Sequence, residues 1–170
     1  RYLMKYSKSE TLSHIVSINN PECLITLNDL ILTEGYDGTE VVFNEDVTVL
    51  DMDCVEINNA RNEGNRNRNS SMDCAFAIKD EVNGNVKMLL VELRFNYKSL
   101  QNLKQDKLLS KVSGTTLALG NSVSISDNYI FIFNSNLKAQ ARSWFFRKFP
   151  TIPRNYMVMD IFELRTNVFA

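Results

Sequence analysis

The sequence predicts a single α/β domain with a central mixed sheet, a β-hairpin and flanking helices. Asn83-Gly84 separates two strand-like segments and is the strongest short signal for a tight hairpin turn. Segments on both sides of this hairpin repeat their apolar residues at helical spacing. Residues 129–133, Tyr-Ile-Phe-Ile-Phe, form a short apolar run typical of a buried strand. We expect one domain over residues 1–170, with a core at about 21–133 and a C-terminal helix and strand within 136–164.

Two helices are predicted at the start of the chain. Ser9 suits the N-cap of a short first helix. The inward residues of this helix would be Leu12, Ile15 and Val16. Asn20 and Pro21 suit the cap and first turn of a second helix, and Gly35 suits its end.

The sequence pattern then becomes typical of β-strands. Residues 41–43 and 47–50 resemble the two strands of a hairpin, and the second strand is expected to run to about Ile57. Residues 58–71 contain no apolar residue beyond Ala60, which predicts a mobile surface loop that is dispensable for folding.

After the Asn83-Gly84 hairpin we expect a helix from near Ser99 to Gly114 or Gly120. Its outward row would be Lys104, Lys107 and Lys111. The buried strand at 129–133 follows, then a helix from Asn136 to Phe149, closed by two prolines. Residues 156–164 are the expected last strand.

Composition excludes several classes of function. The chain has 19 basic and 20 acidic side chains, so a nucleic-acid contact would need a local basic patch. Its single histidine, His14, excludes a histidine-based metal cluster. The three cysteines are widely spaced in apolar segments, which predicts reduced core thiols rather than disulfides. With no apolar run of membrane-spanning length and no secretory signal at the start, we expect a cytoplasmic protein.

The hairpin carries the most informative pattern. If Asn83 and Gly84 are the two central turn residues, Asp73 faces Arg94 and lies diagonal to Glu92. Alternation then sorts the side chains into two faces. The first face is wholly apolar and contains Met72, Cys74, Phe76, Ile78, Leu89, Val91, Leu93 and Phe95. The second holds Asp73, Ala75, Ala77, Lys79, Met88, Leu90, Glu92 and Arg94.

Two carboxylates on one face can converge on a hard cation such as Mg²⁺. In a competing interpretation, Asp73 and Arg94 form a cross-strand ion pair on a solvated face, and Glu92 has no special role. Asp51 and Asp53 share a face of the expected preceding strand and compete with Asp73 as metal ligands.

These residues resemble the PD-(D/E)xK nuclease superfamily, which has the restriction-endonuclease-like fold. The resemblance is carried by Ser71-Met72-Asp73-Cys74-Ala75-Phe76 and by Leu90-Val91-Glu92-Leu93-Arg94, a motif degraded to Asp…Glu-x-Arg. The family's order of helix, three strands, helix and strand also resembles the elements expected between residue 21 and about 133. The resemblance covers most of the chain, but the motif is short and of low specificity.

The resemblance implies a metal-dependent site. Asp73, Glu92 and the carbonyl of Leu93 would hold Mg²⁺ or Mn²⁺, and Arg94 would contact the scissile phosphate. Arg94 replaces the family's lysine and stays protonated, so it is a poor proton acceptor. Lys79 or Lys98 would have to supply the missing lysine, and Glu22 is a candidate additional carboxylate. Side chains that could contact nucleic acid are Arg61, Arg66, Arg68, Lys98 and Lys104.

Three functions compete on this basis. The first is metal-dependent hydrolysis of phosphodiesters in nucleic acid, for example in a defence system. The second is a catalytically inactive module of the same fold that binds protein or nucleic acid, such as a structural subunit or an immunity-type protein. The third is an unrelated α/β adaptor without a site. None of them requires a membrane partner, a haem or a nucleotide cofactor.

Overall fold

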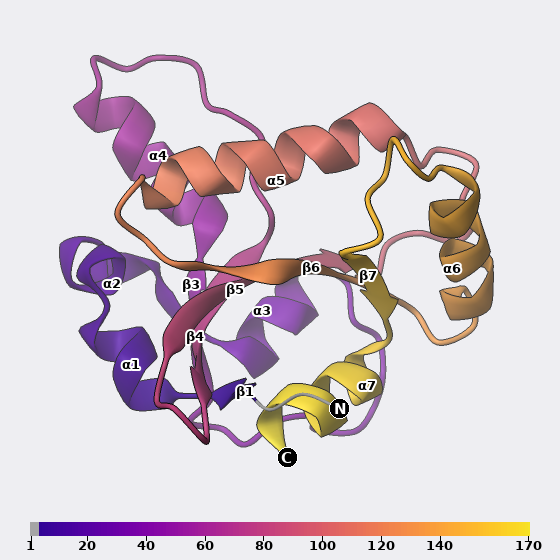
Figure 1. The fold of residues 1–170 in the computed structure, drawn as a ribbon, viewed down its shortest axis with the longest axis horizontal. Coiled ribbons are helices and arrows are strands. Elements are labelled where there is room, and N and C mark those ends of the chain that lie inside the picture. Colours follow the sequence, from indigo (N-terminus) through magenta and orange to yellow (C-terminus); the bar gives the residue numbers. More distant parts are fainter. Residues whose placement is uncertain (1–3) are drawn as a thin grey trace.

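The computed structural model describes residues 4–170, which form a seven-stranded mixed sheet covered by helices on both faces (Figure 1). Six strands follow the order β2-β3-β4-β5-β6-β7, and β1 pairs with β4. The strands are β1 (Met4–Tyr6), β2 (Leu24–Thr26), β3 (Thr48–Asp51), β4 (Cys74–Asp80), β5 (Val86–Arg94), β6 (Ile125–Phe133) and β7 (Tyr156–Met159). Pairing is antiparallel from β2 to β5 and parallel from β5 to β7, as expected for a mixed sheet.

The sheet separates two apolar layers, each of which is covered by helices. Helices α4 (Met52–Asn62), α5 (Gln105–Leu119) and α6 (Lys138–Arg147) pack on one face, together with Val16 of α2 (Ile15–Asn19). Helices α3 (Leu27–Thr33) and α7 (Ile161–Leu164) and the final turn η2 (Arg165–Phe169) pack on the other face. Two short elements, α1 (Lys8–Ser13) and η1 (Pro21–Cys23), complete the N-terminal part.

The β4–β5 hairpin keeps the predicted faces but not the predicted register. Cys74 pairs with Val91, two residues away from the predicted alignment. The tight two-residue turn was wrong: the Asp80 side chain accepts hydrogen bonds from the amides of Val82 and Asn83, and a longer loop forms. Because the offset is even, every strand residue stays on its predicted face. Met72 precedes β4 and joins the opposite layer.

Residues 21–35 form three short elements instead of one helix. Pro21 begins the 3-10 turn η1, β2 follows, and Thr26 then caps α3 by accepting from the amide of Asp29. Gly35 ends this region with φ of 99°, a conformation that favours glycine, so the predicted stop is confirmed. In the first helix, the N-cap is Ser7 rather than Ser9.

The predicted hairpin over residues 41–50 was wrong. Residues 41–43 are irregular, and β3 pairs with the distant β2. The expected continuation of the second strand to Ile57 is the helix α4, because the carboxylate of Asp51 caps it by accepting from the amide of Cys54.

The segment 58–71 is not a free loop. Residues 58–62 belong to α4, and Ala60 is buried. Arg66 pairs with Glu56 at 2.7 Å and with Glu63 at 2.9 Å. The amide of Asn69 also donates to Glu56. The expectation of a mobile, dispensable loop therefore fails, because a buried carboxylate holds the segment against α4.

The C-terminal elements match their predicted types, with shifted ends. Helix α5 begins at Gln105 rather than near Ser99 and ends at Gly120. The predicted buried strand 129–133 is the second half of β6. The last strand stops at Met159, because Asp160 and Glu163 form a capping box that starts α7.

The cysteine prediction was wrong for two of the three residues. Cys23 of η1 and Cys54 of α4 form a disulfide with Cα atoms 5.4 Å apart, and only Cys74 is a buried free thiol. Packing of η1 against α4 brings together two cysteines 31 residues apart in sequence, which their spacing does not reveal. Disulfides are typical of oxidising compartments, so the cysteines do not support the cytoplasmic expectation, which stays a prediction. Within residues 4–170, every helix is too short or too polar to span a lipid bilayer.

Candidate active site

The site is centred on two buried carboxylates, Asp73 and Glu92. Asp73 directly precedes β4, and Glu92 lies near the end of β5. Continuing the observed pairing by one residue places Asp73 opposite Glu92, where Arg94 had been predicted. Asp73 is 7% exposed and Glu92 is 3% exposed. The amide of Leu93 donates to Asp73 Oδ2 at 2.6 Å, which fixes the Asp73 carboxylate at this edge of the sheet.

Burial dominates the protonation of this pair. It raises the pKa of Asp73, and it raises the pKa of Glu92 well above its usual range. The charge of Asp73 raises the pKa of Glu92 further, whereas Arg94 and Lys111 lower it. Two adjacent buried carboxylates disfavour each other's ionisation, and the pKa of Glu92 rises the more strongly of the two.

Two cations reach Glu92 from different elements. Arg94 Nε lies 2.9 Å from Glu92 Oε2, and Lys111 Nζ of α5 lies 3.4 Å from the same oxygen. Lys111 also donates to the carbonyl of Ser71 at 3.1 Å. The competing surface pair of Asp73 with Arg94 is therefore wrong: Arg94 pairs with Glu92, and its side chain is only 10% exposed.

The lysine that lies beside the two carboxylates is Lys111, and neither of the predicted candidates, Lys79 and Lys98, is near them. Lys79 pairs with Val86 near the turn end of the hairpin and is exposed, and Lys98 is exposed beyond β5. The lysines of α5 had been placed on its outer face. Lys111 nevertheless lies three residues after the buried Leu108 and four before the buried Thr115, a spacing that could have identified it as facing the sheet.

A glycine allows Lys111 to reach the carboxylates. A Cβ atom on Gly114 would lie 1.8 Å from the carbonyl oxygen of Ser70, so only glycine lets the segment before β4 cross α5 this closely. The next residue, Thr115, accepts a hydrogen bond through Oγ1 from the amide of Met72 at 2.6 Å. This crossing places Ser71 and Asp73 beside the lysine.

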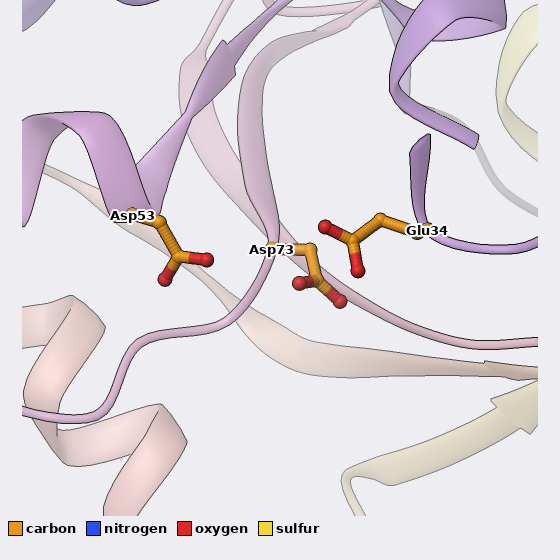
Figure 2. Close-up of side chains that lie close together, drawn as sticks. All are labelled: Glu34, Asp53 and Asp73. Carbon is orange, nitrogen blue, oxygen red and sulfur yellow. The ribbon is translucent and has the colours of Figure 1, made fainter. Parts of the chain in front are cut away.

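Asp73 also belongs to a second cluster of carboxylates, together with Glu34 and Asp53. Single carboxylate oxygens of Glu34, Asp53 and Asp73 all lie within 4.8 Å of one another. Figure 2 shows the Glu34 and Asp73 carboxylates close together, with Asp53 on the other side of Asp73. Glu34 caps the end of α3, and Asp53 lies in the first turn of α4. Burial, and then the charges of Asp73, Asp53 and Asp51, raise the pKa of Glu34 to about 7.

The sequence had pointed to Glu22 on a preceding helix and to Asp51 and Asp53 on the expected preceding strand. Glu22 is exposed and accepts a hydrogen bond from the side chain of Asn58, and it is not a member of the acidic group. Asp51 caps α4, whereas Asp53 takes the position of a ligand beside Asp73. Glu34 was missed because only the packing of the end of α3 over the sheet brings it to Asp73, and no local motif marks that contact.

Three buried polar atoms in the site have no hydrogen-bond partner within residues 4–170. They are Glu92 Oε1, Arg94 Nε and Arg94 Nη2. Arg94 Nε is close to Glu92 but lacks hydrogen-bond geometry. Buried polar atoms are normally satisfied, and exceptions call for an explanation such as a bound ion. The site therefore has an acceptor and donors left for a further ligand.

A cavity of about 350 Å³ borders the site, and its lining includes Asp53, Arg68 and Lys111. Of the predicted nucleic-acid contacts, Arg68 lies at this cavity, whereas Arg66 is held by Glu56 and Glu63. Arg61, Lys98 and Lys104 are exposed, and their contact with nucleic acid stays a prediction.

Leu93 contributes its amide to the site, which donates to Asp73. Its carbonyl as a metal ligand stays a prediction.

Comparison of the chain with protein-family models, with curated proteins and with solved structures found no match.

Proposed function

We propose that this chain is a metal-dependent enzyme that hydrolyses phosphodiester bonds in nucleic acid, on a restriction-endonuclease-like core. The observation that carries the proposal is the convergence of Asp73, Glu92 and Lys111 at one edge of the sheet. Asp73 and Glu92 are the predicted carboxylates. We assign to Lys111 the role of the family's lysine, for which Arg94 is a poor substitute. The order α3, β3, β4, β5, α5, β6 is also compatible with the predicted core, although α4 is inserted after β3.

The residues present fit a hard cation. Glu34, Asp53 and Asp73 offer carboxylate oxygens, the ligands that Mg²⁺ and Mn²⁺ prefer. Glu92 has one buried oxygen without a donor next to them. When bound, the ion would lower the pKa of a water molecule and offset negative charge on the phosphate.

The other side chains divide the remaining tasks. The unpartnered Nη2 of Arg94 can donate to a phosphate oxygen. Lys111 borders both Glu92 and the cavity, so it can orient an attacking water and offset charge on the phosphorane. Arg68, on the cavity wall, is placed to hold the adjacent phosphate.

A catalytically inactive binding module is the second candidate. It is favoured by the contacts of Glu92 Oε2, which already faces both Arg94 and Lys111. An oxygen held by two cations is a weaker metal ligand. In this case the carboxylates keep a structural role, and the cavity binds without cleaving.

Thermal melts with and without Mn²⁺ separate the candidates. At a hundredfold excess over Kd, the ion should raise the melting temperature of the wild type by roughly 5–10 °C. Asp73→Asn should lose this shift, because Asp73 belongs to both acidic groups. Glu81→Gln, in the exposed hairpin loop, is the matched control and should respond like the wild type.

Cleavage of labelled single-stranded and duplex DNA and RNA completes the test. Lys111→Met should keep the Mn²⁺ shift and lose about 10²–10³-fold in rate. A Mn²⁺ shift without any cleavage would support the binding module. An identical shift in the wild type and in Asp73→Asn would contradict the metal site itself.

A further inference from the structure

A second region of the molecule combines exposed aromatic rings with cations that lack anionic partners. It comprises the end of α6 and the segment that follows, and we call it the α6 surface. Its members are Phe146, Arg147, Lys148, Phe149 and Arg154. Phe146 is 64% exposed and Phe149 is 47% exposed. Arg147, Lys148 and Arg154 are exposed as well.

The charged side chains of this region are all basic. Residues 138–159 contain five basic and no acidic side chains, in a chain whose total charge is close to zero. Two of the five, Lys138 and Arg142, are neutralised by Asp160 and Glu163. Within residues 4–170 the other three, all on the α6 surface, form no ion pair. The surface therefore suits an anionic partner.

The rings and cations are organised together. The Arg154 guanidinium lies 4.7 Å from the Phe146 ring centroid and 4.3 Å from that of Phe149. One guanidinium thus bridges two exposed rings. Such a contact limits the motion of the arginine side chain while its polar edge stays available. The result is a pair of exposed rings joined by one positive charge.

The partner must use both features. We propose that the α6 surface binds single-stranded nucleic acid, with bases stacked on Phe146 and Phe149 and phosphates held by Arg147, Lys148 and Arg154. Bases of a single strand expose their flat faces, whereas those of a duplex are stacked inside it. Aromatic platforms beside a basic track are a common arrangement for binding single strands with little sequence preference.

An anionic membrane surface fits the observations less well. Interfacial helices bury a continuous apolar face in the lipid. The inward residues of α6 are already used, because Phe145 packs against Phe131 and Phe133 of the sheet and Ala141 is fully buried. Phe146 and Phe149 are the exposed rings of this segment, Trp144 is half-buried, and Arg154 lies against both exposed rings.

The α6 surface is separate from the carboxylate site. Strands β5, β6 and β7 are parallel, and Glu92 pairs with Phe131 near their C-terminal ends. Helix α6 follows β6 and starts beyond the C-terminal ends of these strands. It runs back towards their N-terminal ends, where β7 begins. The surface at its end is therefore remote from Asp73, and it can succeed or fail independently of the proposed hydrolysis.

The binding test uses the chain's own reporter. Trp144 is the only tryptophan, lies on α6, and has Lys148 Nζ 5.5 Å from its ring. The Asp73→Asn protein, in EDTA so that no divalent ion takes part, is titrated with a short oligothymidylate, and Trp144 fluorescence and the anisotropy of the labelled oligonucleotide are followed. We expect saturable quenching, and weaker binding to a duplex of the same length.

Two sets of variants locate the surface. Phe146→Ala with Phe149→Ala should weaken binding by about tenfold per ring. Its control is Leu32→Ala with Leu117→Ala, which removes two equally exposed apolar side chains from other helices. Replacing Arg147, Lys148 and Arg154 with Ala should reduce the salt dependence of log Kd by about 2. Its control removes three other exposed lysines: Lys8, Lys79 and Lys107.

Three results would overturn the proposal. One is equal affinity of the ring variant and its control. Another is equal affinity for duplex and single strand, with the rings irrelevant to both. The third is ring-dependent binding to vesicles containing phosphatidylserine without binding to oligothymidylate, which would assign the surface to a membrane. Thermal melts of each variant show that it is folded, and the single variant Phe146→Ala replaces the double variant if that one is not.

Discussion

Two clusters in this protein contain the same types of charged side chain and behave in opposite ways. Each has an aspartate, a glutamate, a lysine and an arginine. The first, which we call the cap cluster, consists of Asp160, Glu163, Lys138 and Arg142. The second is the site cluster of Asp73, Glu92, Lys111 and Arg94. The pKa values of the carboxyl groups are lowered in the cap cluster and raised in the site cluster.

The difference lies in how many donors reach each carboxylate. Burial alone would raise the pKa of Asp160, but hydrogen bonds from Lys138, the Glu163 amide and Ser135 outweigh it. In the site cluster the largest effect is again burial, and Glu92 Oε1 has no donor at all within residues 4–170. A set of charges that satisfies itself stabilises a fold, whereas one left unsatisfied by its own neighbours is suited to bind something else.

Gly114→Ala should produce the largest change, and it should affect only one cluster. The added Cβ would meet the Ser70 carbonyl at 1.8 Å, so the crossing over α5 must open. We expect a loss of about 2–3 kcal/mol of unfolding free energy, together with loss of the Mn²⁺ shift. Urea unfolding measures the first effect. Ser113→Ala, the exposed neighbour on the same helix, should leave the Mn²⁺ shift unchanged; a normal shift in Gly114→Ala would separate this crossing from the site.

Neutralising one aspartate in each cluster should shift stability in opposite directions. Asp160→Ala removes the cap of α7 and leaves Lys138 with one partner fewer, so we expect a loss of about 2 kcal/mol. Asp73→Asn removes a carboxylate that opposes Glu92, so we expect a gain of about 1 kcal/mol without metal. Urea unfolding at neutral pH compares both with the wild type. Destabilisation by both substitutions would mean that the site cluster is structural.

The pH dependence of stability extends the contrast to Glu34, which lies beside Asp73 of the site cluster. Glu34 titrates at 4.5 when unfolded and at about 7 when folded, so the folded state binds the extra proton. Stability should therefore fall as pH rises between these values, and Glu34→Gln should remove part of the fall. The lowered pKa values of the cap cluster act in reverse: their contribution is present at neutral pH and is lost in acid.

Melting curves at pH values from acid to neutral, for the wild type, Glu34→Gln and Glu163→Gln, test this contrast. Glu163→Gln should change the acid limb, and Glu34→Gln should change the limb between pH 4.5 and about 7. The same slope in all three proteins would show that neither cluster controls the pH response.

Local patterns revealed the part of the site that lies on one hairpin. Alternation of apolar and polar residues was enough to place Asp73, Glu92 and Arg94 on one face. The pairing of the strands was not recoverable, because the side chain of Asp80 organises a longer turn than Asn83-Gly84 suggested. An even offset left the faces intact while it replaced Arg94 with Glu92 as the neighbour of Asp73.

The rest of the site depends on contacts between distant segments. Glu34, Asp53 and Lys111 come from three helices. Asp53 was a candidate ligand and the spacing of Lys111 places it inward, but no local pattern predicts that they meet at Asp73, and Glu34 was missed. The strand predicted after Leu50 was also wrong, because β-branched residues there suggested a strand while Asp51 provided a helix cap. Single residues with a capping role outweighed the propensity of the residues around them.

The contact between the first strand and the last turn has a consequence for how the molecule opens. Lys5 donates to the carbonyl of Asn167, and the ring of Phe169 packs against Tyr6, Phe43 and Phe76. This contact closes a loop of 162 residues, whereas the candidate site is assembled from residues 34–111. Fraying at the two ends should therefore open the layer beneath α3 and α7, which meets the site only through Glu34 at the end of α3. Amide exchange in β1 should report this partial opening, and exchange in β5 should report the unfolding of the whole sheet.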